Sequence, residues 1–189
     1  MNQETVSQST KSRIIDAALN LVLENGNTAI TISAVCEQSG ISRTTVYRCF
    51  NNASDIVEAV FTEVRDRYER GLRAAIARDP APENRLDVVT DYMARHAVSG
   101  ITEKIARCSH ELIDRLAGSI HESRQQLYTE VLAPYLNMFA RMKNSPVDIP
   151  FIAHTLVYYY AGLVKTRDGS SAEEIKTRLK RLITGLSMV

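Results

Sequence analysis

The sequence predicts an all-α protein of about nine helices, in which an N-terminal three-helix domain is followed by a larger helical domain. Three observations favour this fold class. Apolar residues recur at helical spacing along almost the whole chain of 189 residues. Segments in which β-branched residues alternate with polar ones, the pattern of strands, are nearly absent. Glycine and proline fall between the helical segments, where they can end a helix.

The first helix is expected to start with Thr10 as its N-cap residue and to end at Asn25-Gly26. Its apolar stripe recurs every three or four residues and consists of Ile14, Ala18, Leu21 and Val22. Glycine at position 26 can adopt the left-handed conformation that commonly follows a helix.

Two short helices follow, and each has its own start signal. Thr31 is the predicted N-cap of the first, which runs to Gly40, and Ser42 is the predicted N-cap of the second, which runs to Phe50. An isoleucine precedes each cap and is placed to pack on the valine five positions later. The segment 31–50 therefore predicts a helix, a tight turn and a second helix.

Longer helices account for the rest of the chain. A fourth helix is expected from about Asn52, with Asp55 at the capping-box position, to about Arg78, where the segment 79–82 (Asp-Pro-Ala-Pro) ends it. Later helices are expected at 83–97, 102–108, 111–143, 148–166 and 171–187. Pro134 is expected to kink or split the longest of them. The predicted domains are 1–52 and 53–189.

The segment 31–50 has the organisation of a DNA-binding helix-turn-helix. At 100° per residue, Val46 and Phe50 face one side of its second helix, whereas Thr44 and Arg48 point nearly opposite. Arginine can pair with guanine, and threonine methyl groups can meet thymine, so the polar side is a candidate recognition face. The alternative is an ordinary surface helix, and periodicity does not decide between the two.

The residue pattern of 13–57 favours the first interpretation. This span, about a quarter of the chain, resembles the DNA-binding domain of the TetR (tetracycline-repressor-like) family. Its core, TISAVCEQSGISRTTVYRCF, follows the family pattern T-x-x-x-[IV]-A-x-x-x-G-[VI]-S-x-x-T-[LV]-Y-x-x-F. Cys36 stands at the usual alanine. Nine positions are in register: Thr31, Val35, Gly40, Ile41, Ser42, Thr45, Val46, Tyr47 and Phe50.

The resemblance implies which residues approach DNA. Phosphates or base edges would be contacted by Thr31, Ser33, Ser42, Tyr47 and Arg48, and most bases would be read by Arg43, Thr44 and Thr45. Ala53 stands where the family often has a phosphate-binding lysine. Lys11 and Arg13, expected in the first turn of the first helix, could compensate by contacting phosphate; the alternative is that both are simply solvated.

The resemblance also implies that the domain 53–189 encloses a small-molecule effector and forms a homodimer. Candidate pocket residues, each of which could instead be ordinary core, are Tyr92, Met93, His96, His110, Tyr128, Tyr135, Phe139 and Tyr158. The last two helices would pair with their two-fold mates, or pack wholly within one subunit, through Val157, Ile175, Leu179, Leu182 and Leu186. Aromatic and histidine side chains favour a largely apolar ligand with a polar handle.

The sequence therefore predicts a one-component transcriptional regulator, by family default a repressor, that binds a palindromic operator on double-stranded DNA as a homodimer and responds to a small molecule. Signatures of nucleotide-binding loops, hydrolase elbows, HExxH metal sites and the ExxH pairs of di-iron bundles are absent. We expect no enzyme activity, catalytic residue, cofactor or metal. Helical-bundle oxidoreductases are the runner-up class, and an adaptor that has lost DNA binding is a third.

Composition limits the remaining classes. The net charge is only +1, so the DNA prediction depends on where cations lie and not on their number. Three cysteines without CxxC spacing fit reduced thiols, with redox sensing through Cys49 as an alternative. Residues 1–9 are polar, and the longest nearly apolar run, 151–164, is shorter than the roughly 20 residues that cross a bilayer. A cytoplasmic protein with no membrane partner is expected.

Overall fold

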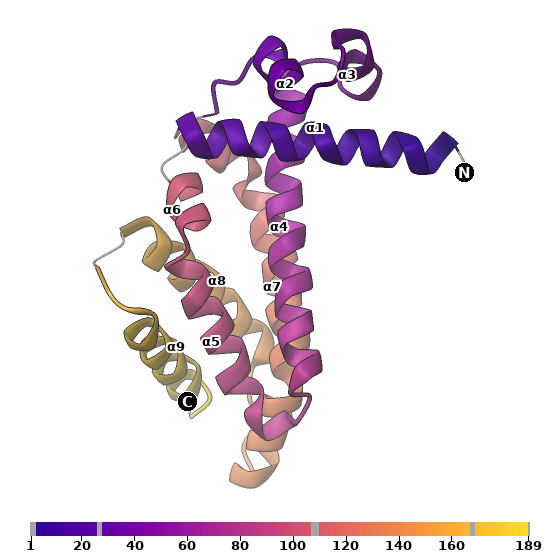
Figure 1. The fold of residues 1–189 in the computed structure, drawn as a ribbon. Helices are drawn as coiled ribbons and strands as arrows, with labels where there is room; N and C mark the ends of the chain where they lie inside the picture. Colours follow the sequence, from indigo (N-terminus) through magenta and orange to yellow (C-terminus); the bar gives the residue numbers. More distant parts are fainter. Residues whose placement is uncertain (1–2, 26–27, 107–109, 167–168, 189) are drawn as a thin grey trace. The chain divides into compact units, whose positions relative to one another are not determined.

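The structure, a computed structural model, describes residues 3–25, 28–106, 110–166 and 169–188, and in these ranges it is helical with no strand (Figure 1). The predicted all-α fold class is confirmed. The elements are α1 (Gln3–Asn25), α2 (Ile32–Ser39), α3 (Arg43–Cys49), α4 (Ala53–Arg78), a 3₁₀ turn η1 (Pro82–Asn84), α5 (Arg85–Ala97), α6 (Gly100–Ala106), α7 (His110–Lys143), α8 (Ile149–Thr166) and α9 (Ala172–Leu186).

The helices form two compact units. The first contains α1, α2, α3 and the part of α4 up to Tyr68. The second starts at Glu69 and contains the rest of α4, nearly all of α7, and α5, α6, α8 and α9. The division falls inside α4 because this helix is continuous and contributes core residues to both units. A domain boundary between residues 52 and 53 stays a prediction.

The start of α1 differs from the sequence prediction. The helix begins at Gln3, so Thr10 lies inside it and the prediction that Thr10 is its N-cap is wrong. The preceding segment contains neither proline nor glycine, and nothing in it stops a helix from extending towards the N-terminus. Lys11 and Arg13 consequently lie in the middle of α1 and not in its first turn.

The helix-turn-helix is built from local caps, as predicted. Thr31 Oγ1 accepts a hydrogen bond from the backbone N–H of Ala34 at 3.1 Å, and Ser42 Oγ accepts one from the N–H of Thr45 at 3.3 Å. Gly40 ends α2 with a φ of 65°, in the left-handed region. The predicted staple residues are all buried: Ile30, Val35, Ile41 and Val46.

α4 starts with Asn52 as its cap. Asn52 Oδ1 accepts a hydrogen bond from the N–H of Asp55 at 2.9 Å. The Asp55 carboxylate in turn accepts from the backbone N–H and the side-chain amide of Asn51, at 3.2 and 2.9 Å. The predicted capping box is therefore displaced, because Asp55 reaches the residue before the cap and not the cap itself. The helix ends at Arg78, as predicted.

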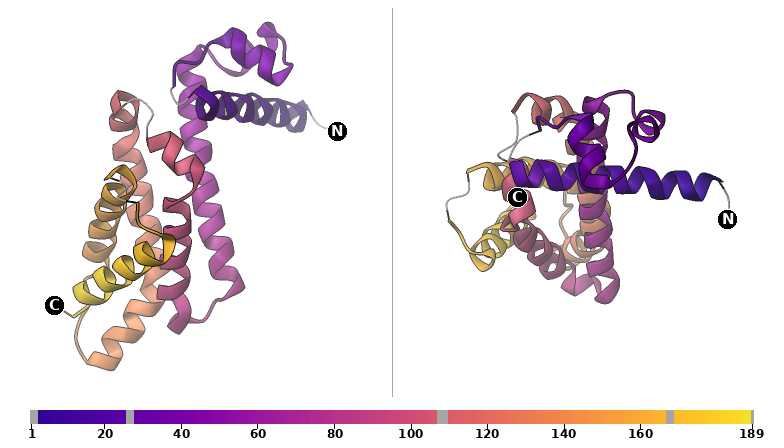
Figure 2. Two further views of the ribbon diagram at one scale, coloured as in Figure 1. Left: turned by 60° about the vertical axis from the view of Figure 1, so that its left-hand side comes forward. Right: turned by 45° about the horizontal axis from the view of Figure 1, so that its top comes forward.

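In the second unit, α5 and α9 lie side by side (Figures 1 and 2). Val89, Met93, Leu179 and Ile183 are fully buried on these two helices. Lys176 Nζ of α9 lies 3.1 Å from an Asp87 carboxylate oxygen and 3.4 Å from one of Asp91, both on α5. Lys180 also pairs with Asp87. Hydrogen bonds from Lys180 and Lys176 lower the pKa of Asp87.

The close packing of α4 on α5 depends on a glycine. A Cβ added to Gly71 of α4 would lie 2.2 Å from the hydroxyl oxygen of Tyr92 on α5. Any side chain at Gly71 would therefore displace the Tyr92 ring.

Two later boundaries also bear on the predictions. α7 runs without interruption from His110 to Lys143, so the prediction that Pro134 could split it is wrong. Buried Val131, Leu132 and Leu136 hold the helix against the core on both sides of the proline. α9 starts with a complete capping box between Ser171 and Glu174.

No helix in the described residues is long and apolar enough to cross a membrane.

Candidate nucleic-acid interface

α3 presents a polar face to solvent. Val46 is fully buried and Phe50 nearly so, whereas Thr44 and Arg48 are exposed on the opposite side. This is the orientation that the helical angle predicts. Tyr47, next to Val46, is 46% exposed although it is aromatic. Together these side chains form a polar and aromatic face of the kind that lies in a groove of DNA.

The hydroxyl groups at the start of α3 are occupied within the protein. Ser42 Oγ caps the helix and lies 2.9 Å from Thr45 Oγ1. Thr31 Oγ1 is likewise used as the cap of α2. By contrast, Thr44 and Arg48 make no side-chain hydrogen bond or ion pair with any residue that the structure describes. These two side chains are the ones most available to a partner.

Arg43 connects the two helices of the motif. Its Nη1 lies 3.5 Å from Ser33 Oγ on α2, and its Nη2 lies 3.4 Å from the Tyr47 hydroxyl one turn along α3. The guanidinium carbon is 5.7 Å from the centroid of the Tyr47 ring. The hydrogen bond to Tyr47 raises the pKa of Arg43. The fold thus brings together three of the predicted DNA-binding residues.

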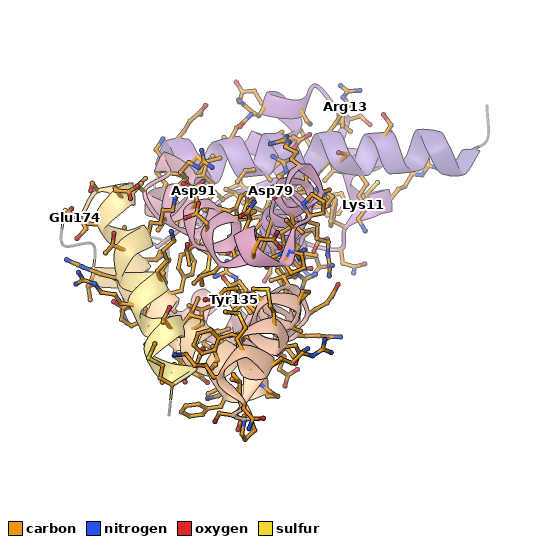
Figure 3. The ribbon with its side chains drawn as sticks, turned by 90° about the horizontal axis from the view of Figure 1, so that it is seen from below. Lys11, Arg13, Asp79, Asp91, Tyr135 and Glu174 are labelled. Carbon is orange, nitrogen blue, oxygen red and sulfur yellow. The ribbon has the colours of Figure 1, made fainter. Side chains whose placement is uncertain are left out.

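Lys11 and Arg13 hold α1 against the helix-turn-helix (Figure 3). Arg13 Nη2 donates a hydrogen bond of 3.0 Å to the carbonyl oxygen of Ser39, at the C-terminal end of α2, where a cation is favourable. Lys11 Nζ lies 5.4 Å from the centroid of the Phe50 ring. Both side chains are still exposed, so phosphate contact stays a prediction for them.

The start of α4 carries no cation to replace the absent lysine. Ala53 is half-buried, and the Asp55 carboxylate lies beside it, bonded to Asn51. A negative charge at this helix start opposes phosphate binding by the backbone N–H groups.

The second unit contains a polar cluster centred on buried Thr102 and Tyr160, here called the buried polar cluster, whose other members are half-buried: His96, Ser99 and Arg124. His96 Nδ1 lies 3.0 Å from the Tyr160 hydroxyl and 3.1 Å from Thr102 Oγ1. Tyr160 donates to the carbonyl of Met93 at 3.1 Å, and Ser99 donates to Thr102 at 2.9 Å. The Arg124 guanidinium lies 5.7 Å from the centroid of the Tyr160 ring. The cluster therefore joins α5, α6, α7 and α8.

Burial controls the ionisation of this cluster. Desolvation, with a smaller contribution from the Arg124 charge, lowers the pKa of His96 to about 4. Desolvation also raises the pKa values of Tyr160 and Tyr92. At neutral pH the histidine and both tyrosines are therefore uncharged hydrogen-bonding groups.

The predicted effector-pocket residues fall into separate places. Four lie at or next to the buried polar cluster: Tyr92, Met93, His96 and Tyr128. Tyr135 and Phe139 stack on each other along α7, with ring centroids 6.2 Å apart. His110 is the first residue of α7, but its side chain lies outside the described part. None of the eight lines the open depression of about 550 Å³ at the C-terminal end of α7.

Tyr158, the eighth candidate, points outwards. It is 54% exposed, and its ring centroid lies 4.9 Å from that of His121 and 4.8 Å from that of His154. The tyrosine that lies in the core is Tyr160, which was not among the candidates expected from the sequence. The signal for it was present, since the buried residues of α8 are spaced by one, three or four: Ile152, Ala153, Leu156, Val157 and Tyr160.

The predicted dimer residues are also divided. Val157, Ile175 and Leu179 are buried inside one subunit, whereas Leu182 and Leu186 are half-buried. The exposed side of α8 carries a different set, here called the α8 outer stripe: Phe151, His154, Tyr158 and Gly162. Phe151, like Tyr158, is 54% exposed.

The cysteines give no sign of a further site. Cys36 and Cys49 are half-buried free thiols, and Cys108 lies outside the described residues. Across the described ranges, no three histidine, cysteine, aspartate or glutamate side chains are placed to hold a metal ion.

Comparisons with known proteins match both the motif and the fold. Residues 14–60 match the family described as bacterial regulatory proteins, tetR family. The HTH-type transcriptional regulator UidR of Escherichia coli K12 is 31% identical over 98 residues, which cover 52% of this chain and 46% of UidR. The chain thus spans about half the length of the curated relatives it matches.

Solved structures extend the likeness of fold to the whole chain. A putative transcriptional regulator from Pseudomonas aeruginosa PAO1 superposes with a TM-score of 0.71 at 18% identity, covering 99% of this chain and 97% of the other. RolR, solved in complex with resorcinol, superposes with a TM-score of 0.61 at 13% identity, covering 98% and 95%. At these identities the superpositions show the fold.

Proposed function

We propose that this chain is a transcriptional regulator of the TetR family that binds duplex DNA through the exposed face of α3. The observation that carries the proposal is the geometry of α3. Its apolar side is buried, while Thr44 and Arg48 extend into solvent beside Tyr47. Two locally capped helices fix this face before any partner binds.

The chemistry of this face suits the major groove. Arg48 and Arg43 can each form a bidentate pair with O6 and N7 of guanine, and Thr44 can place its methyl group against thymine. A recognition helix of only seven residues reaches few base pairs. We therefore propose a homodimer whose two copies of α3 read a palindrome with half-sites about one helical turn apart. Such a role would place the protein in the cytoplasm.

The α8 outer stripe, together with Leu182 and Leu186 of α9, is the proposed dimer surface. Three of the dimer residues expected from the sequence are already used in the core of one subunit. Phe151 and Tyr158 leave two aromatic rings more than half exposed along a single helix face. Burying such rings against a second copy is a main source of affinity in protein interfaces.

The variant Phe151→Glu/Tyr158→Glu is expected to be a folded monomer, because two carboxylates on each copy would be buried in the interface without partners. Sedimentation velocity measures the change in mass, and circular dichroism checks that helix content is kept. Met142→Glu is the matched control, since Met142 is 75% exposed on α7 and is not part of the α8 outer stripe. A double variant that stays dimeric would show that the dimer surface lies elsewhere.

We propose further that a small molecule regulates DNA binding from the second unit and that the protein is a repressor released by it. RolR, which has the same fold, is described as a complex with the ligand resorcinol. In this chain the buried polar cluster, with Tyr92, Met93 and Tyr128 around it, offers hydrogen-bonding groups among apolar ones. That combination suits a largely apolar compound with a polar group.

Selection of bound duplexes from a random DNA pool tests the proposal. Purified protein is expected to enrich a palindrome whose half-site centres are about 10 base pairs, or a multiple of a helical turn, apart. Because non-specific binding depends strongly on salt, the selection is made at near-physiological ionic strength. A pool that shows no enriched sequence would contradict the proposal and favour an adaptor that has lost DNA binding.

A further inference from the structure

Ser33, Arg43 and Tyr47 form a small cluster across α2 and α3, here called the Arg43 clamp. We propose that Ser33 and Tyr47 are positioning residues, which hold the Arg43 guanidinium so that it reads one guanine in each half-site. The inference rests on the proposed DNA-binding function. It assigns to Ser33 a role in sequence specificity, although Ser33 itself need not touch a base.

The geometry of the clamp supports this role. One terminal nitrogen of Arg43 lies 3.5 Å from Ser33 Oγ, and the other lies 3.4 Å from the Tyr47 hydroxyl. Both distances are long for N–H···O hydrogen bonds, so each bond is weak. The Tyr47 ring, 5.7 Å from the guanidinium carbon, adds a third contact. Together the three contacts select one orientation of a long and otherwise flexible side chain.

The two hydroxyl groups are themselves held on fixed backbone. Ser33 lies in the first turn of α2, between the Thr31 cap and buried Val35. Tyr47 follows Val46, which is fully buried. Buried neighbours therefore fix the backbone that carries the clamp, although the clamp's own side chains are exposed.

The hydrogen-bond capacity of arginine permits the clamp and base reading together. A guanidinium has five N–H donors, and the two hydroxyls accept one donor from each terminal nitrogen. Three donors are left, and a bidentate pair with guanine O6 and N7 needs two. Preorganisation of this kind lowers the conformational entropy that Arg43 loses on binding. It also disfavours a wrong base, since the held guanidinium group cannot rotate to pair with it.

A direct phosphate contact by Ser33 is the competing role, and the two roles have different consequences. Loss of a phosphate contact weakens binding to all sequences by a similar factor. Loss of a positioning contact lowers discrimination at the base pair that Arg43 reads and leaves the other positions unchanged.

The experiment compares enriched sequences from the random pool for wild-type protein, Arg43→Ala, Ser33→Ala, Ser33→Thr and Tyr47→Phe. Arg43→Ala should abolish the preference for G·C at one position of each half-site. Ser33→Ala and Tyr47→Phe should lower the preference at that same position by about twofold to fivefold, the lower part of the usual effect of one hydrogen bond, because both bonds are long. Ser33→Thr keeps the hydroxyl and should keep the preference. Thr44→Ala is the matched control, and its effect should fall on another base pair.

Three outcomes would overturn the inference: a uniform loss of affinity for Ser33→Ala, an unchanged preference at every position, or an effect at a base pair that Arg43→Ala does not alter. Thermal unfolding should be nearly unchanged in all variants, because the substituted side chains are exposed. If the wild-type protein enriches no sequence, the proposed function fails, and that failure is separate from the failure of the clamp.

Discussion

The double variant Thr44→Ala/Arg48→Ala is expected to lose roughly a thousandfold in affinity for the selected operator while folding normally. Each lost base contact weakens binding about fivefold at the low end of the usual range, and a dimer loses four such contacts. Both side chains are exposed and have no side-chain hydrogen-bond or ion-pair partner among the described residues. Their removal is therefore expected to leave the fold intact, so the loss of operator affinity comes from lost contacts with DNA.

Fluorescence anisotropy measures this loss, with the selected duplex and a scrambled duplex titrated at one fixed salt concentration. The variant should bind both duplexes weakly and keep only the part of the preference for the selected duplex that Arg43 and Thr45 supply. Arg141→Ala is the control for charge, because Arg141 is an exposed cation of α7 outside the proposed interface. Operator affinity within a factor of about two of wild type would refute α3 as the recognition face.

His96 is expected to make the free energy of unfolding fall by about 3 kcal/mol between pH 7 and pH 4. In the folded protein, burial and Arg124 lower its pKa from 6.5 to about 4. The unfolded chain therefore binds more protons than the folded one throughout this window. Protonation stabilises the unfolded state first, so stability decreases as the pH falls below the unfolded pKa and stops decreasing below the folded one.

Urea unfolding at several pH values between 7 and 4.5 measures the effect in wild type and in His96→Gln. Asp87, whose pKa is lowered in the folded state, also loses its contribution in acid, but it does so equally in both proteins. The difference between the two profiles isolates His96. If His96→Gln does not fold, an NMR titration of the His96 ring gives the pKa directly. Identical pH profiles, or a ring that titrates above pH 6, would contradict the buried polar cluster.

The helix-turn-helix could be predicted from sequence because its signals are local. Thr31, Gly40 and Ser42 each determine one helix end through their own backbone or side chain. The start of α1 could not be predicted in the same way, since Thr10 can cap a helix but does not prevent one from continuing past it. A capping residue shows where a helix can begin and not that it must begin there.

In the second unit, helical spacing predicts which side chains are buried better than residue type does. Tyr158 and Tyr160 are both tyrosines of one run, yet one is exposed and the other is buried beside His96. The helical angle separates them, whereas the aromatic character of the residue does not. For Ile175 and Leu179 the spacing correctly indicates burial, but the helix that covers them, α5, is far away in the sequence. Packing contacts between helices that are far apart in the sequence cannot be predicted from the residue pattern of either helix.

The central claim is that duplex DNA binds to α3, and NMR chemical-shift mapping tests it most directly. Isotope-labelled protein is titrated with the selected operator, and the backbone amide signals are compared with those of free protein. We predict that the largest changes lie at Ser42 to Arg48 and at Thr31 and Ser33, with small changes in α8. Unchanged α3 signals, with the largest changes elsewhere on the described chain, would contradict the account.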